Sequence, residues 1–422
     1  MTGPAAIVPD RRGLRTAYAF GLFSMALIDV FVFLIPVYAG ITLGMSDGEI
    51  GTLVGARSIL SLFLSIHGGA LMDRFGVRRI SLVYAGTVVL CAPLFPVLTD
   101  FYALLVLQVI SGFAISMSWT GAQILIARVA EGDAEYIGRF SSFSRVGTAV
   151  APVIAGILFD LGGAWLAYGF GTVWAMFAFA AIWAAPEPDI ATDARHRPDP
   201  ASGGTRPRLR LRDLVPRVSD YAASFALMAI PAVALTAIAM LVRNSSYGIQ
   251  TSVYMTYTQG IGFSATAIGF LFAAIEMSAG LGSWFSGRAM RRFDARWVLI
   301  LSTVATITLV CATPLYGWMT PTLWLIYACL VVAQIVRGLI QGVSQPILAA
   351  VQAKAVGRHQ QGSVVGLRQT MNRICGITVP PVIGLASEMF GREESFLVVG
   401  AGLLLICGAL ALYARRVPPI SG

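Results

Sequence analysis

The sequence predicts an all-α membrane protein of twelve transmembrane helices, arranged as two pseudo-symmetric bundles of six. Three observations predict it. Of the 422 residues, 57% are hydrophobic and only 12% are charged, whereas soluble domains carry about a quarter charged residues. A segment that begins at Gly69 returns in degenerate form at Gly287, and arginines gather in alternate connections between apolar segments. The chain therefore belongs in lipid and contains an internal duplication.

Apolar segments bounded by turn residues define the expected helices, since about 20 apolar residues in helical form cross a bilayer. The first segment, from about Leu14, is too long for a removable signal peptide and has no small-residue cleavage site, so we expect it to stay as the first helix. The expected helices cover about 14–40, 47–72, 80–98, 101–127, 140–162, 164–185, 231–258, 264–290, 297–317, 321–350, 363–386 and 395–414.

One segment interrupts this pattern and gives the domain division. After Pro186 the chain is rich in proline, arginine, aspartate and glycine and has no periodic apolar face, as expected of a flexible linker. We expect an amphipathic helix on the inner surface at 218–230. The predicted domains are an N-terminal six-helix bundle at 1–185, a cytoplasmic linker at 186–230 and a C-terminal six-helix bundle at 231–422.

The net charge of +9 reflects membrane topology. A nucleic-acid-binding protein would gather its basic residues into one soluble patch, so we expect no nucleic-acid partner. Because arginine-rich connections stay inside, both termini are predicted to be cytoplasmic, in a multi-pass protein of the cytoplasmic membrane. Acids such as Asp47, Asp100 and Asp160 fall on the other side.

Motifs for metal, redox or catalytic chemistry are missing from the sequence. The five cysteines lie singly within apolar segments, without paired spacing. No phosphate-binding loop, zinc spacing or nucleophile elbow is present. We therefore expect no cofactor, no metal ligands and no catalytic residues, and the protein is not predicted to be an enzyme.

The internal repeat extends beyond the segments at Gly69 and Gly287. In the fourth and tenth expected helices, Gln108 and Gly112 match Gln334 and Gly338. The fifth and eleventh expected helices share a second pattern, in which Arg145, Pro152 and Gly156 match Arg373, Pro380 and Gly384. Two six-helix halves of this kind are a known transporter architecture.

A family resemblance rests on the first copy of the repeated segment. Its Gly69, Asp73, Arg74, Gly76 and Arg78 resemble the signature between the second and third helices of the major facilitator superfamily. The resemblance implies a transporter that works by alternating access between its two halves. It also implies a gating role for this motif, which stabilises the outward-open state in that family. The alternative is that these arginines only set the topology.

Eight ionisable residues lie inside expected helices, where each charge costs about 2.5 to 3.5 kcal/mol on insertion scales and is by default functional. They are Asp29, Arg57, Arg145, Arg243, Glu276, Arg337, Arg368 and Arg373. Six are arginines, whose guanidinium groups match carboxylate or phosphate with two parallel hydrogen bonds. The excess of arginine predicts a small anionic substrate. The predicted substrate-binding residues are Arg57, Arg145, Arg243, Asn244, Tyr247, Arg337, Gln341 and Arg373.

Asp29 and Glu276 are the candidates for proton coupling, because they are the two acids expected deep in the bundle. A buried carboxyl next to an arginine can exchange a proton when a substrate arrives. The alternative is that both acids serve only as salt-bridge partners. The expected partners of the protein are therefore an anionic small molecule, protons and the lipid bilayer, and the protein is expected to be a monomer.

The sequence thus favours a secondary transporter of a small anion, proton-coupled or working by exchange. A second hypothesis is a proton-driven exporter of lipophilic drugs, which needs an aromatic cavity. Its candidate residues are Phe23, Phe31, Phe33, Trp119, Tyr247 and Tyr254. A third is a membrane sensor that keeps the fold without transport.

Overall fold

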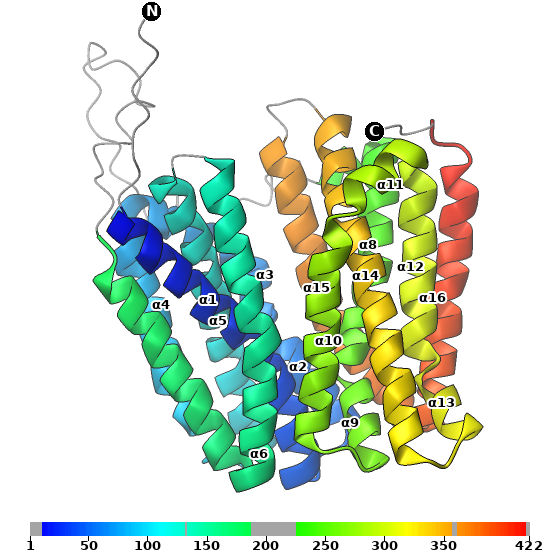
Figure 1. Cartoon of the computed structure of the whole chain (residues 1–422), viewed down its shortest axis with the longest axis horizontal. Helices are drawn as coiled ribbons and strands as arrows, with labels where there is room; N and C mark the ends of the chain where they lie inside the picture. The colour runs from blue at the N-terminus through cyan, green and yellow to red at the C-terminus, as the bar shows by residue number, and fades with distance from the viewer. Residues whose placement is uncertain (1–10, 131–132, 187–224, 357–360, 419–422) are drawn as a thin grey trace, which may run out of the picture.

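The structure is a computed structural model that describes residues 11–130, 133–186, 225–356 and 361–418. Within these residues the regular structure is helical throughout, with no β-strand. Figure 1 shows the helices of the first half on one side of the molecule and those of the second half on the other. The boundaries of the predicted domains stay a prediction, because most of the expected linker lies outside the described residues.

The first half contains six numbered α-helices. They are α1 (Arg11–Val37), continued by the π-helix η1 (Tyr38–Thr42), then α2 (Asp47–Ala56), α3 (Ile59–Phe75), α4 (Val77–Cys91), continued by η2 (Ala92–Leu94), α5 (Phe101–Val129) and α6 (Ala134–Ala184). The α2 and α3 helices form one rod with a break at Arg57 and Ser58. Non-helical backbone at Gly162 and Gly163 divides α6 into two rods, and Gly163 takes a positive φ of 66°, which glycine adopts at little cost.

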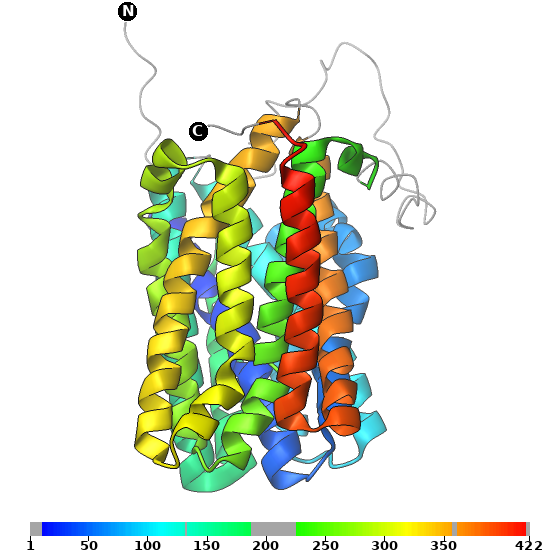
Figure 2. The ribbon, with the colours of Figure 1, turned by 90° about the vertical axis from the view of Figure 1, so that its right-hand side faces the viewer.

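The second half repeats this arrangement with more breaks. It contains η5 (Leu227–Ala229), α8 (Pro231–Gln250), α9 (Val253–Gly260), α10 (Ala265–Ser283), α11 (Ser286–Arg292), α12 (Ala295–Cys311), α13 (Thr313–Met319), α14 (Leu323–Ala355), α15 (Gln361–Phe390) and α16 (Arg392–Ala414). In Figure 2, α16 runs along the near face of this half. Of the expected amphipathic helix, 218–224 lie outside the described residues, and Leu227 is buried against α8.

Eight of the described helices are long and apolar enough to cross a membrane, and nine if the bent pair α12 and α13 counts as one span. In this count α6 enters once, although it contains two rods, and the α2–α3 rod and the polar α15 do not enter. The all-α membrane fold is therefore confirmed, and the structure is consistent with twelve spans.

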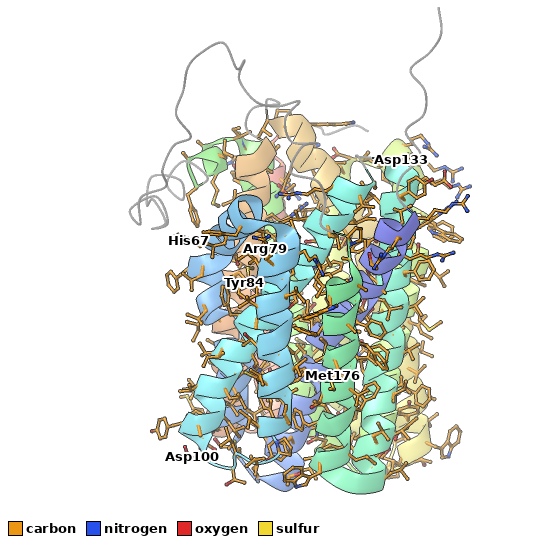
Figure 3. The ribbon with its side chains drawn as sticks, turned by 90° about the vertical axis from the view of Figure 1, so that its left-hand side faces the viewer. His67, Arg79, Tyr84, Asp100, Asp133 and Met176 are labelled. Atoms are coloured by element: carbon orange, nitrogen blue, oxygen red, sulfur yellow. The ribbon has the colours of Figure 1, made fainter. Side chains whose placement is uncertain are left out.

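Side-chain caps fix where several of these helices begin. Ser46 and Glu49 form a capping box at the start of α2, which satisfies backbone N–H groups that have no helical partner. The Asp100 carboxylate caps α5, and the Ser264 hydroxyl caps α10. These caps lie at the end of the molecule opposite the start of α1, where Figure 3 also places Asp100.

The repeated arginine segments tie helices together within each half. Arg78 Nη2 donates a 2.6 Å hydrogen bond to the Trp183 carbonyl at the end of α6. In the second copy, Arg296 Nη1 donates a 3.0 Å bond to the Ala414 carbonyl at the end of α16. Cations at helix C-termini are favourable. Both arginines therefore fasten the last helix of their own half.

Part of the predicted gating motif contributes backbone geometry. Gly76 ends α3 with a φ of 96°, so the chain can turn directly into α4. Gly69 has open space around it. Of Asp73 and Arg74 only the backbone lies within the described part of the structure, so their gating role stays a prediction. Figure 3 places Arg79, next to this turn, at the same end of the molecule as Asp133.

Candidate substrate cavity

A cavity of about 310 Å³ lies between the two halves, which is within the range of small-molecule sites. The first half contributes residues around the break between α2 and α3, and the second half contributes α8, α10, α14 and α15. Its lining consists of Val54, Arg57, Ser58, Arg243, Asn244, Tyr247, Gly248, Thr251, Glu276, Gln341, Gln345, Asn372, Arg373, Cys375, Gly376 and Pro380. The cavity thus gathers six of the eight predicted substrate-binding residues and one of the two candidate acids.

Arg57 lines the cavity from the break between α2 and α3. It follows α2 directly, and its backbone packs against Gly112 of α5. A Cβ atom at Gly112 would lie 2.5 Å from the Arg57 Cβ and 2.7 Å from its carbonyl oxygen. The repeated glycine of the fourth helix therefore provides the close approach that positions Arg57.

Arg243 is 5% exposed and is surrounded by neutral partners. Its Nη1 donates to Ser344 Oγ at 3.3 Å and its Nη2 to Asn244 Oδ1 at 3.2 Å. Asn244 in turn donates to Asn372 Oδ1. These bonds orient the guanidinium toward the cavity without neutralising its charge.

Arg373 crosses between the halves. Its Nη1 donates to Ser116 Oγ of α5 at 3.4 Å. Within the described residues, no carboxylate oxygen lies within 4 Å of the guanidinium nitrogens of Arg373 or Arg243. Both charges therefore face the cavity with neutral hydrogen-bond partners only.

The structure places Arg337, a predicted substrate-binding residue, away from this cavity. Arg337 is 1% exposed and does not line the cavity. Its Nη1 donates to Gln250 Oε1 at 2.7 Å and to Gln334 Oε1 at 3.2 Å, and its Nη2 donates to the Ser246 carbonyl at 2.8 Å. The side chain points into the interior of the second half, between α8 and α14, where it binds these helices together.

Arg145 and Glu276 form an ion pair between the halves. Arg145 Nη1 of α6 lies 3.8 Å from Glu276 Oε2 of α10, with side chains 42% and 25% exposed. Arg145 is not among the cavity-lining residues, whereas Glu276 is. In this structure Arg145 therefore contacts Glu276 and not the cavity.

Asp29 lies behind the cavity wall and is not among its lining residues. Tyr247 donates a 3.5 Å hydrogen bond from its hydroxyl to Asp29 Oδ1, which joins α1 to α8. Asp29 also lies within electrostatic range of Arg57, Arg145 and Glu276. Glu276 thus compensates Arg145 and Asp29 compensates Arg57 in part, so the charges least compensated at the cavity are those of Arg243 and Arg373.

The six aromatic residues of the drug-export hypothesis do not gather around this cavity. Of its six candidate residues, Tyr247 alone lines the cavity. The others pack elsewhere: Phe31 with Phe95 and Tyr168, Phe33 with Phe272, Phe23 with Trp174, and Trp119 with Phe140, while Tyr254 is fully buried.

Beyond the cavity, toward the end remote from the repeated arginine segments, the halves meet along two junctions. In the α2–α15 junction, a Cβ at Gly51 would lie 2.2 Å from the Pro380 carbonyl oxygen, and one at Gly384 would lie 2.3 Å from the Asp47 carbonyl oxygen. Glu388 Oε1 accepts a 3.0 Å hydrogen bond from the Gly48 N–H. The glycines therefore allow the two backbones to touch.

The α6–α10 junction repeats these contacts. A Cβ at Gly269 would lie 2.8 Å from the Pro152 carbonyl oxygen, and one at Gly156 would lie 2.5 Å from the Ala265 carbonyl oxygen. Asp160 accepts backbone hydrogen bonds from Ala265 at 3.0 Å and Thr266 at 2.8 Å. The glycine and proline pattern seen in the sequence thus serves contact between the halves.

Comparison with known proteins agrees with this architecture. The sequence matches the Major Facilitator Superfamily over residues 17–380 and again over 235–422. The chain belongs to this superfamily. Among curated proteins, it is 22% identical to the enterobactin exporter EntS of Salmonella typhi, over 88% of this chain and 85% of that one. It is 24% identical to EntS of Escherichia coli O127:H6, over 97% and 94%.

Solved structures show the same superfamily fold. The nucleoside transporter NupG aligns with a TM-score of 0.75 at 14% identity, over 96% of this chain and 99% of that one. A bacterial homologue of the human lysosomal transporter Spinster, in an inward-facing and unoccupied conformation, aligns with a TM-score of 0.66 at 17% identity, over 97% and 98%. As a superfamily member, the protein is a multi-pass membrane transporter of small molecules and not an enzyme.

Sequence reasoning missed several residues of this superfamily member's cavity and junctions. Ser58 and Asn372 line the cavity but are neutral, and so carried no charge signal. Asp160 and Glu388 were visible as acids, yet their role depends on which helix end meets them across the halves. A repeat alignment that paired Asp160 with Glu388 could have indicated that role.

Proposed function

We propose that the protein exports a small anionic solute across the cytoplasmic membrane by alternating access, coupled to protons. One observation carries the proposal: the inter-half cavity presents the charges of Arg243 and Arg373 without a carboxylate partner among the described residues. An uncompensated buried charge is costly, and an entering anion removes that cost. Amides and a phenol around the cavity supply further hydrogen bonds.

Export is supported by the curated relatives, which are named as exporters at 22 to 24% identity. The proposed direction of transport rests on these relatives, whereas the proposed class of solute rests on the charges of the cavity. The distribution of arginines supports cytoplasmic termini. With that orientation, the two junctions close the outer end, so the conformation is inward-facing. A substrate would then enter from the cytoplasm, as an exported solute must. We propose that the transporter works as a monomer.

Proton coupling is proposed for Asp29 and Glu276. Each carboxylate takes part in a contact between the halves, Asp29 with Tyr247 and Glu276 with Arg145. Protonation of either acid would weaken its contact and release an arginine for the substrate. Binding of the anion and uptake of a proton would thereby be linked.

The test is a screen of the purified protein for stabilisation by anions, followed by transport in proteoliposomes. A ligand that prefers the folded state raises the melting temperature by mass action. We expect Arg373→Gln to raise the anion concentration needed for half-maximal stabilisation on the order of tenfold or more. This is the change in dissociation constant that follows from the loss of a charge-assisted hydrogen bond. Arg368→Gln is the matched control, since it lies on the same helix outside the cavity. Equal responses of both variants would refute the proposal.

Coupling is tested separately with Asp29→Asn. We expect this variant to lose transport driven by a pH gradient and to retain substrate exchange at equal pH, because only the protonation step is removed. Active proton-driven transport by Asp29→Asn and also by Glu276→Gln would exclude both acids.

A further inference from the structure

The two junctions correspond residue by residue under the internal repeat. The offset that pairs Gly69 with Gly287 also pairs Gly51 with Gly269. The offset that pairs Pro152 with Pro380 also pairs Asp160 with Glu388. Both sets of partners make the same contacts in the structure. The repeat is therefore a reliable guide to equivalent positions along the junctions.

At the level of the cavity this equivalence fails in one respect. Arg145 and Arg373 are equivalent, so the partner of Arg145, Glu276, should have a counterpart that faces Arg373. The same offset places Ser58 at that position. Ser58 lines the cavity and is 3% exposed. The α6–α10 junction thus contains an ion pair, whereas the α2–α15 junction contains an arginine opposite a neutral hydroxyl.

A second arginine makes the difference larger. Arg57 precedes Ser58 and lines the same cavity as Arg373, close enough for the two charges to repel each other. Asp29 compensates Arg57 in part, but it belongs to the same half as Arg57, so this compensation places no anion between Arg57 and Arg373. Where one junction has a cation and an anion, the other has two cations from opposite halves.

We propose that the anionic group of the substrate binds in the α2–α15 junction, between Arg57 and Arg373 beside Ser58, where it takes the place that the Glu276 carboxylate holds in the α6–α10 junction. The inference rests on the proposed function and specifies its ligand as a solute with a planar oxyanion, such as a carboxylate. Arginine pairs bind such groups through parallel hydrogen bonds. Since the two arginines belong to different halves, the bound group also holds the halves together.

The test supplies the missing carboxylate from the protein. Ser58→Asp places a negative charge beside Arg373, and Ser58→Asn is the control of nearly the same shape without charge. The full-length protein is titrated with sodium benzoate, with sodium phosphate and with neutral benzamide, and its melting temperature is recorded. We expect benzoate to stabilise wild type and Ser58→Asn, and benzamide to stabilise neither.

For Ser58→Asp we expect the apparent affinity for benzoate, taken from the titration of the melting temperature, to fall on the order of tenfold or more. The reason is that the introduced carboxylate competes for the same arginines. Stabilisation by phosphate but not benzoate would assign the site to inorganic oxyanions and would overturn the carboxylate assignment. An unchanged benzoate response in Ser58→Asp would overturn the proposed position.

Two further variants separate this inference from the proposed function. If no anion stabilises wild type, the proposed function fails as well. If benzoate stabilises wild type and Arg243→Gln abolishes the response while Ser58→Asp and Arg57→Gln do not, the cavity binds anions elsewhere and the inference alone fails. If Ser58→Asp does not fold, Arg57→Gln carries the test: a response equal to that of wild type refutes the site, and a loss supports it.

Discussion

The α2–α15 and α6–α10 junctions are alike at the closed end and unlike at the cavity. At the closed end each has two glycines against carbonyl oxygens and an acid on the first turn of the opposite helix. At the cavity, one has the Arg145–Glu276 ion pair and the other has Arg373 opposite Ser58. We infer that the duplicated contacts at the closed end serve the conformational change, in which both halves take part. The position where the two junctions differ, Glu276 in one and Ser58 in the other, is the one that we assign to substrate.

The largest effect is expected from filling a glycine contact at the closed end. In Gly51→Val, the added Cβ would meet the Pro380 carbonyl oxygen at 2.2 Å. Backbone cannot move aside as a side chain tip can, and overpacking costs about 1 to 3 kcal/mol or more. We expect the closed conformation to be depleted at least tenfold, measured as loss of transport and by spectroscopic distances between labels on the two halves. Gly280→Val, which meets nothing within 4 Å, should transport normally, and equal activity of both variants would contradict this account.

A smaller effect is expected from the acid at the start of α10. Asp160→Asn keeps an acceptor but removes the charge that faces the helix N-terminus, an interaction of about 0.3 to 1 kcal/mol when exposed. We expect the equilibrium between the conformations closed and open at the outer end to shift a few-fold toward the open one. The shift is measured as faster labelling of a cysteine introduced at Thr266. The matched control is Asp100→Asn, whose carboxylate caps α5 within its own half. That variant should lower thermal stability without changing the labelling rate, and a similar change in both would show that Asp160 acts only as a cap.

Much of the fold was predictable because its signals are local. Apolar segments, glycine and proline turns, and the repeat at Gly69 and Gly287 gave the helices and their duplication. The break at Arg57 divides the second expected helix into α2 and α3, whereas the turn at Gly163 lies where the sequence predicts one, between the expected helices 140–162 and 164–185. The orientation of single side chains was less accessible, because it depends on the helix that packs opposite.

Arg337 and Arg373 illustrate that limit. Both are arginines in the middle of expected helices, and the same substrate-binding role is predicted for both. In the structure, Arg337 faces Gln250 and Ser246 within its own half, whereas Arg373 faces the other half and the cavity. Which face of a helix meets which neighbour is a tertiary property, so the number of arginines favours the hypothesis of an anion site but does not predict which arginines line the cavity.

The smallest effect is expected from the ion pair at the outer end of the α2–α15 junction. Arg392 Nε lies 2.8 Å from Asp47 Oδ2, and Ser387 Oγ donates a 2.6 Å bond to the same oxygen. The Asp47 side chain is only 6% exposed, but the Arg392 side chain is 46% exposed, so solvent screens the pair and we expect a contribution near the 0 to about 1 kcal/mol of exposed ion pairs. We expect Arg392→Gln to change transport less than about five-fold, and raised salt to reduce the difference from wild type by screening the charges. Since Ser387 and the glycine contacts remain, a complete loss of transport in this variant would show that charge, and not backbone contact, holds the outer end closed.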